Sequence, residues 1–164
     1  MIGLQIRFLA GRFHANPWQH AHNEGIPEWP PSPWRVMRAL ESAAYAEGVS
    51  ADDMEPLLLR LSDPPSYMLP LAVDAHTRHY MPDTDDPNHK RAKVFDAFVA
   101  VDGGAADPQP VTLAWSAELE SDQRALLARL CRRVAYVGRA ESWADLRVVD
   151  LEEDRWQCVP SDDE

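Results

Sequence analysis

The sequence predicts an α+β domain in which strands and helices alternate. Three patterns predict this class: strict apolar alternation over residues 2–9, apolar stripes of helical spacing that begin near residues 33 and 121, and further two-residue patterns between residues 66 and 115. The chain of 164 residues has the length of one domain and can bury a substantial core. Hydrophobic residues make up 45% of it and charged residues 26%, so we expect a folded unit rather than a disordered chain.

The first predicted strand is IGLQIRFL, residues 2–9. Alternation puts four large apolar side chains on one face, as a half-buried strand requires: Ile2, Leu4, Ile6 and Phe8. A loop rich in glycine, proline, histidine and asparagine is predicted to follow as far as about residue 31.

The first helix is predicted over residues 33–47. Ser32 can serve as the N-cap, Pro33 suits the first helical position and Gly48 suits a left-handed C-cap. Its apolar stripe is predicted to consist of Trp34, Met37, Leu40 and Ala44.

A second, shorter helix is predicted over residues 53–62, with Asp52 and Asp53 near its start. Pro56 is tolerable only in the first turn, which places the helix start shortly before it. Three leucines of this helix are predicted to pack inward: Leu57, Leu58 and Leu61.

The middle of the chain has the two-residue period of strands. Four segments are predicted as strands: SYMLPLAV (66–73), AHTRHYMP (75–82), VFDAFVAV (94–101) and VTLAW (111–115). The charged segment 82–93 between two of them is predicted to be an exposed, mobile loop.

A long helix is predicted over residues 121–137, with Ser121 as N-cap and Gly138 as its end. The side chains expected to face the core are Leu126, Leu130, Cys131 and Val134. LRVVDL (146–151) is predicted as the last core strand, RWQCV as an edge strand and PSDDE as an acidic tail. The order of these elements is that of a βαββαβ, ferredoxin-like (RRM-like) sandwich with an inserted hairpin and loops.

Composition excludes several classes of protein. No apolar run approaches the roughly 20 residues that span a bilayer, and the start MIGLQIRFLAGRF lacks a basic segment before its apolar part. We therefore expect a cytoplasmic protein with no membrane partner. Two cysteines, Cys131 and Cys158, are too few for a disulfide framework or a thiolate zinc site, and both are expected to be reduced and buried.

The net charge of −11 argues against a nucleic-acid partner, because lysine and arginine drive binding to phosphates. The acidic residues are unevenly distributed, however. Residues 1–50 hold four arginines and four acidic residues, whereas residues 151–164 hold one arginine and six acidic residues. The neutral first third can therefore still form a local basic groove.

The histidines raise two chemical hypotheses. His20-x-His22 and His76-x-x-His79 could converge with Glu24 or Glu28 on a metal, but no HExxH or paired-carboxylate motif accompanies them. Histidine can also act as general acid or base on RNA without a metal, and the candidates are His14, His20, His22, His76 and His79. No pair is defined by the sequence, so we assign no catalytic residue, no metal and no cofactor.

Residues 25–40, GIPEWPPSPWRVMRAL, predict a rigid turn into the first helix, which we call the elbow. Trp29 and Trp34 are expected to anchor it by burial. Arg35 falls in the first helical turn, where the macrodipole disfavours a cation, so an anion is expected beside it. Two sources remain open: an internal carboxylate of Glu28 or Glu24, or a bound phosphate held by Arg35 and Arg38.

In AHTRHYMP, alternation puts His76, Arg78 and Tyr80 on one strand face and Thr77, His79 and Met81 on the other. Neither set is typical of a core. Aromatic and guanidinium groups side by side suit base stacking and phosphate contact, and Lys90, Arg91 and Lys93 follow. The alternative is an edge hairpin whose polar groups meet solvent or a partner protein. In YVGRAESW, Arg139 and Glu141 are expected to pair locally or to support the elbow.

The motifs GRFHANPWQHAHNEGIPEWPPSPWRVMRAL, HTRHYMP, VFDAFVAV and YVGRAESW occur in that order over roughly residues 1–150. In this combination the chain resembles the N-terminal, Cas-five-like half of the fused Cas-five/Cas-six (Csb-two) subunit of type I-U, or I-G, CRISPR systems. The resemblance implies a RAMP domain over residues 1–152, with residues 153–164 as an edge strand and acidic tail that begin a linker. Members of the family continue into a second, Cas-six-like RAMP domain, so we expect repeat-cleaving activity to lie outside residues 1–164.

The resemblance also implies partners. The chain would bind the 5′ handle of the CRISPR RNA in a Cascade surveillance complex, cap the Cas-seven-type backbone, contact the large Cas-eight-type subunit and the Cas-six-like domain, and reach target DNA only indirectly. The residues that we expect to bind RNA are His14, His20, His22, Asn23, Arg35, Arg38, His76, Arg78, His79, Tyr80, Lys90, Arg91 and Arg139. The alternative function is a metal-independent endoribonuclease that processes the CRISPR repeat.

Overall fold

The computed structural model describes residues 1–20, 24–82, 91–151 and 156–161. It shows an α+β fold with three α-helices and two antiparallel sheets in these residues. The larger sheet has the order β3-β6-β1-β7, formed by Ser66–Met68, Val111–Trp115, Ile2–Phe8 and Ala144–Asp150. All of its neighbouring strands run antiparallel, and β1 lies between β6 and β7.

The predicted alternation of β1 is confirmed. Ile2, Leu4, Ile6 and Phe8 are all buried, and they belong to one core with side chains from the helices. Leu9 is exposed, so the strand ends one residue earlier than predicted.

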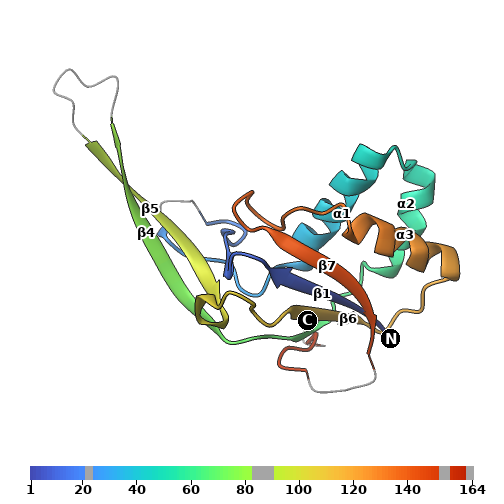
Figure 1. Cartoon of the computed structure of the whole chain (residues 1–164). Helices are drawn as coiled ribbons and strands as arrows, with labels where there is room; N and C mark the ends of the chain where they lie inside the picture. Colours follow the sequence, from blue (N-terminus) through green and yellow to red (C-terminus); the bar gives the residue numbers. More distant parts are fainter. Residues whose placement is uncertain (21–23, 83–90, 152–155, 162–164) are drawn as a thin grey trace.

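Three helices lie on one side of the larger sheet (Figure 1). They are α1 (Pro33–Glu47), α2 (Ala51–Arg60) and α3 (Ser121–Cys131). α1 packs against both α2 and α3, and α3 packs against β7. Among the described residues, none of these helices is long and apolar enough to cross a bilayer.

The bounds of α1 are confirmed, and Gly48 adopts the left-handed conformation with φ 69°. The predicted apolar stripe is wrong in part, because the buried side is formed by Val36, Leu40, Ala43 and Ala44. Trp34 is exposed and Met37 is only half-buried. The sequence offers two apolar stripes that share Leu40 and Ala44, and the buried one is the stripe with the smaller side chains.

α2 begins at Ala51, two residues before the predicted start, because Ser50 caps it by accepting a hydrogen bond from the Asp53 amide at 3.1 Å. Pro56 therefore lies inside the helix rather than in its first turn. The inward packing of the three leucines is confirmed: Leu57 and Leu61 are buried and Leu58 is partly buried against the core.

α3 differs most from the prediction. Glu120, not Ser121, is the N-cap, because a capping box joins Glu120 and Gln123. The helix ends at Cys131 rather than residue 137, and buried Val134 and Val137 continue the apolar pattern within the loop that follows. Gly138 is needed there for another reason: its φ is 85°, and a Cβ at this position would lie 2.7 Å from the His14 carbonyl oxygen.

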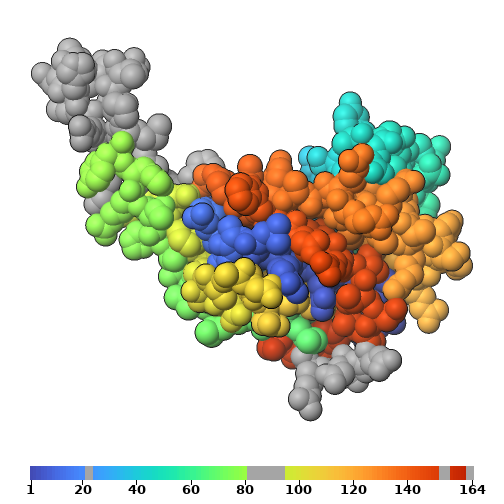
Figure 2. Space-filling view, viewed as in Figure 1, coloured from blue at the N-terminus to red at the C-terminus, as the bar shows by residue number. Residues whose placement is uncertain are grey.

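The smaller sheet has the order β2-β5-β4, formed by Arg12–Phe13, Arg91–Val101 and Ala72–Pro82. β4 and β5 form a long hairpin whose outer part stands clear of the rest of the molecule, and we call this hairpin the arm (Figures 1 and 2). The predicted loop 82–93 is shorter than expected because its two ends belong to the strands, and residues 83–90 lie outside the described residues. The strand predicted over 66–73 is divided after Met68, and β2 lies in the predicted loop.

The end of the described chain lies beside β3. Instead of the predicted edge strand, Cys158 forms a single β-bridge with Tyr67, whose amide donates to the Cys158 carbonyl at 2.8 Å. A 3₁₀ turn, η2 (Asp102–Gly104), follows the arm. Cys131 is buried as predicted, whereas Cys158 is exposed because it lies at this outer edge.

Candidate nucleic-acid interface

The elbow is held by a carboxylate at the start of α1. Glu28 accepts hydrogen bonds from the Ser32 amide at 3.0 Å and from Arg35 Nε at 2.9 Å. Ser32 occupies the N-cap position without a side-chain cap bond, so Glu28 supplies the acceptor that this helix end needs. Its negative charge also complements the positive end of the helix dipole.

Of the two possible anions beside Arg35, the structure therefore shows the internal one, which is the carboxylate of Glu28. Arg35 also donates through NH2 to the Asn16 carbonyl at 2.5 Å, which ties the helix to the preceding loop. Glu24 contacts His20 instead, at 2.5 Å between Oε2 and Nδ1. His22 and Asn23 lie outside the described residues. Trp29 is partly buried against the core, whereas Trp34 does not anchor the elbow by burial.

Arg38 lies on the exposed side of α1. Its guanidinium carbon lies 5.8 Å from the centroid of the Trp34 ring, and NH1 lies 3.2 Å from Glu41. Arg38 and Trp34 line a groove of about 650 Å³. Its other wall comes from the segment after α3, with Arg133 and Tyr136. We call this the arginine groove. Arg133 and Tyr136 were not among the residues expected to bind RNA; the signal for them in the sequence is a basic and an aromatic residue three positions apart.

Ion pairs with acidic residues reduce the net positive charge of this groove. Arg133 Nε lies 2.6 Å from Glu47, and Arg35 is neutralised by Glu28. Arg38 and Arg133 are mostly exposed, so their pairs are weak and can open to admit an anion.

His14 is enclosed at the root of the arm, with 2% of the residue exposed. Its ring stacks on Phe98 with 4.9 Å between centroids, and Nδ1 lies 3.4 Å from Asp96 Oδ2. Neither ring nitrogen has a hydrogen bond among the described residues. Burial lowers the pKa of His14, and the Asp96 carboxylate opposes this shift only in part. The neutral ring is thus a packing group that the surrounding protein separates from any surface ligand.

Arg139 also lies at the root of the arm. It contacts Asp96 of β5 at 2.6 Å and Glu141 at 3.1 Å, and its amide donates to the His14 carbonyl at 3.0 Å. The expected local pair with Glu141 is therefore present, and Asp96 adds a contact to the arm. Arg139 fixes the arm against the loop that follows α3.

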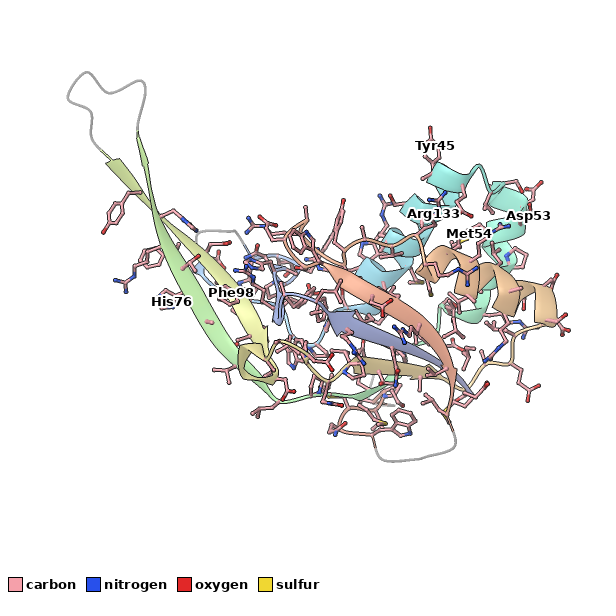
Figure 3. The ribbon with its side chains drawn as sticks, in the orientation of Figure 1. Tyr45, Asp53, Met54, His76, Phe98 and Arg133 are labelled. Carbon is pink, nitrogen blue, oxygen red and sulfur yellow. The ribbon has the colours of Figure 1, made fainter. Side chains whose placement is uncertain are left out.

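The outer part of the arm has a different character. The register pairs Arg78 with Phe95 and Tyr80 with Lys93, so the predicted set of His76, Arg78 and Tyr80 shares one face with Phe95. The Arg78 guanidinium carbon lies 5.5 Å from the Phe95 centroid, and the His76 and Phe95 centroids lie 6.1 Å apart. Figure 3 shows His76 on the arm, with Phe98 nearer its root. We call these four residues the arm face.

The arm face is open to solvent. Tyr80 is 63% exposed and Phe95 is 42% exposed. Among the described residues, no carboxylate forms a salt bridge with Arg78. Exposed rings beside such a guanidinium can stack on bases and hold a phosphate.

The histidines of β4 do not form a metal or catalytic pair. His76 and His79 lie on opposite faces of the strand, and His79 Nε2 lies 3.1 Å from the Thr77 hydroxyl. No group of three or more histidine, cysteine or acidic side chains converges within the described residues. Lys90 lies outside the described residues, and Arg91 begins β5 with a side chain that is not described.

Most of the described site residues expected from sequence fall into three places: Arg35 and Arg38 at the elbow, His14 and Arg139 at the root of the arm, and His76, Arg78 and Tyr80 on the arm face. His20 lies in the loop before the elbow and His79 on the opposite face of β4. No protein-family model matches the chain, and no curated protein matches it at a significant level. The function of the chain therefore has to be argued from the arrangement of these site residues.

Proposed function

We propose that this chain is a non-catalytic RNA-binding subunit of a type I CRISPR Cascade complex. In this role it would bind the 5′ handle of the CRISPR RNA and cap the Cas-seven-type backbone, in contact with the large Cas-eight-type subunit and a Cas-six-like domain in the cytoplasm. The motifs that resemble the Cas-five-like half of the Csb-two family support the proposal. The observation that carries it is the arm face.

The strand order supports a ferredoxin-like RAMP domain. β1 and β3 are joined through α1 and α2, yet β6 lies between them in the sheet. β6 and β7 are joined through α3, yet β1 lies between them. Each strand–helix–strand unit is thus split by a strand of the other, as in split βαβ folds. In this arrangement the arm is a hairpin inserted between the second and third strands of the sandwich.

The arm face supports RNA as the ligand. Tyr80, Phe95 and His76 offer ring surfaces, and Arg78 offers both a stacking plane and a charge for phosphate. These groups lie on a two-stranded ribbon that extends away from the body, so a single strand of RNA can pass along them (Figure 1). Aromatic rings can stack on any of the four bases, and this contribution to binding does not depend on the net charge of the protein. A chain of net charge −11 can therefore still bind RNA.

The test uses the purified chain with end-labelled handle RNA and end-labelled repeat RNA, in EDTA, with native and denaturing gels run from one tube. We expect a shift of the handle with the repeat left intact. Combined Arg78→Ala and Tyr80→Ala should weaken the shift at least about tenfold, because each stacked base contributes about 1–3 kcal/mol.

The matched control is Val73→Ala, an exposed residue on the opposite face of β4. Its RNA affinity should equal that of the unmodified chain. An equal shift by the Arg78→Ala/Tyr80→Ala variant, or no shift by the unmodified chain, contradicts the proposal. Cleavage of the repeat in EDTA supports the endoribonuclease instead.

A further inference from the structure

A second groove, unrelated to the arm, runs between α1 and α2. It measures about 590 Å³, and its apolar lining includes Trp34, Met37 and Tyr45 from α1 and Met54, Leu58 and Leu59 from α2. Figure 3 shows Tyr45 and Met54 on these two neighbouring helices. We call it the apolar groove.

The borders of this groove are exposed, whereas its floor belongs to the core. Tyr45 is 89% exposed, Leu59 is 65% exposed and Trp34 is 57% exposed, while Met54 is 4% exposed. A single exposed apolar residue is ordinary, but three large ones around one concave apolar surface indicate a place where another molecule is bound.

The shape of the groove fits a helix. Its lining on α1 extends from Trp34 through Met37 and Glu41 to Tyr45, at the three- and four-residue steps of one helix face. At 1.5 Å per residue this face is about 16 Å long, which equals three turns of a partner helix. Apolar residues at i, i+3 or i+4, and i+7 of an amphipathic helix occupy grooves of this kind.

The charges around the groove define the partner further. Glu41 and Glu55 are among its lining residues. Arg38, the one cation among its described lining residues, is paired with Glu41. An occupant with lysine or arginine beside its apolar stripe complements these carboxylates, whereas an acidic helix is repelled.

We propose that the apolar groove binds a basic amphipathic helix of another protein. A second copy of this chain is a poor occupant, because each copy has a net charge of −11 and the copies repel each other. Trp34 and Arg38 line both this groove and the arginine groove, whereas Tyr45, Leu58 and Leu59 line only this one, so the inference does not rest on RNA binding.

The experiment is a selection from a displayed library of 15-residue helical peptides in which the positions of one face and its flanks are randomised. The full chain is the target, and enriched peptides are then measured by fluorescence anisotropy. We expect an apolar i, i+3 or i+4, i+7 stripe with lysine or arginine beside it. Combined Tyr45→Ser and Leu59→Ser should weaken their binding at least about tenfold, because buried anchors dominate such interfaces.

Two matched variants make the result specific. Leu71→Ser with Val73→Ser removes two other exposed apolar residues, which do not line the groove, and should leave peptide affinity unchanged. Glu41→Lys with Glu55→Lys keeps the apolar lining and should weaken the basic peptides while it improves their charge-reversed versions.

Several outcomes overturn the inference. They are the absence of enriched peptides, an enrichment of acidic peptides, and binding that the Tyr45→Ser/Leu59→Ser variant leaves unchanged. A concentration-dependent dimer in analytical ultracentrifugation that this variant abolishes would assign the groove to a second copy. Binding to lipid vesicles that it abolishes would assign the groove to a membrane surface.

Discussion

The elbow and the arm face contain the same kinds of residue but use them in opposite ways. At the elbow, Arg35 has an internal carboxylate from Glu28 and a carbonyl from Asn16. On the arm face, Arg78 lies over the Phe95 ring and has no salt bridge to a described carboxylate. The comparison teaches that an arginine near an aromatic residue in the sequence indicates a binding surface only where no largely buried carboxylate among the described residues pairs with it.

The two regions also differ in what their side chains stabilise. The Glu28 side chain is 12% exposed and that of Arg35 is 31% exposed, so their pair is a part of the folded framework. The arm face has few internal contacts to lose, because its side chains are directed to solvent. Substitutions at the elbow should therefore lower stability, and substitutions on the arm face should lower ligand affinity.

The largest effect is expected for Glu28→Ala. The variant leaves the Ser32 amide and a partly buried Arg35 without their acceptor. We expect a loss of about 2–4 kcal/mol in the free energy of unfolding, measured by urea denaturation, because an unpaired, partly desolvated charge is costly. RNA affinity, measured where the variant is folded, should change little.

Glu41→Ala is the matched control for Glu28→Ala, since Glu41 pairs with Arg38 on the same helix at an exposed position. It should change the free energy of unfolding by less than about 0.5 kcal/mol. Equal losses of unfolding free energy in the two variants would mean that the Glu28–Arg35 pair contributes no more to stability than an exposed surface ion pair.

The next largest effect is expected for Tyr80→Ala on the arm face. Loss of one stacking ring should weaken RNA binding by about 1–3 kcal/mol, measured by fluorescence anisotropy with handle RNA. Its free energy of unfolding should stay within about 0.5 kcal/mol of the unmodified chain, because Tyr80 is mostly exposed. A stability loss with unchanged RNA affinity would show that the arm face is structural, like the elbow.

The parts of the fold that were predictable from sequence are those with a strong local signal. Strict alternation defined β1, and a proline at the first position with a glycine at the end defined α1. The end of α3 was not predictable, because Val134 and Val137 keep the helical apolar period in a loop that is fixed by tertiary contacts. β2 has only two residues, and its pairing with β5 depends on a segment far away in the chain.

For the candidate site, the sequence predicted which residues share a strand face but not which groups pair with the charged ones. Alternation correctly grouped His76, Arg78 and Tyr80. The sequence could not decide between Glu28 and a phosphate beside Arg35, because both satisfy the same helix end. It also could not show that His14 is buried, since its burial depends on Phe98 from a distant strand.

A smaller effect is expected from pH at the root of the arm, which joins the two regions. Burial lowers the pKa of His14 below 6.5, Asp96 and Glu141 raise it in part, and Arg139 and Arg12 lower it further. Below about pH 6.5 the unfolded chain takes up a proton that folded His14 does not, so stability present above this pH should fall as the solution is acidified.

The measurement is the free energy of unfolding of the unmodified chain and of His14→Gln between about pH 7 and pH 5. The difference between the two should change in favour of His14→Gln as the pH falls. Parallel curves would mean that His14 binds a proton equally well in the folded and unfolded states.

The smallest effect separates Arg35 from Arg38, the two arginines that would hold a phosphate in one of the two alternatives that the sequence left open. Arg38→Ala removes an exposed charge that lines the arginine groove, so the slope of log affinity for RNA against log salt should fall by up to about 1 while stability is unchanged. Arg35→Ala should leave that slope as it is, because Glu28 already neutralises this guanidinium. If Arg35→Ala flattens the salt dependence instead, Arg35 leaves Glu28 when RNA binds, and the elbow then contacts RNA as the arm face does.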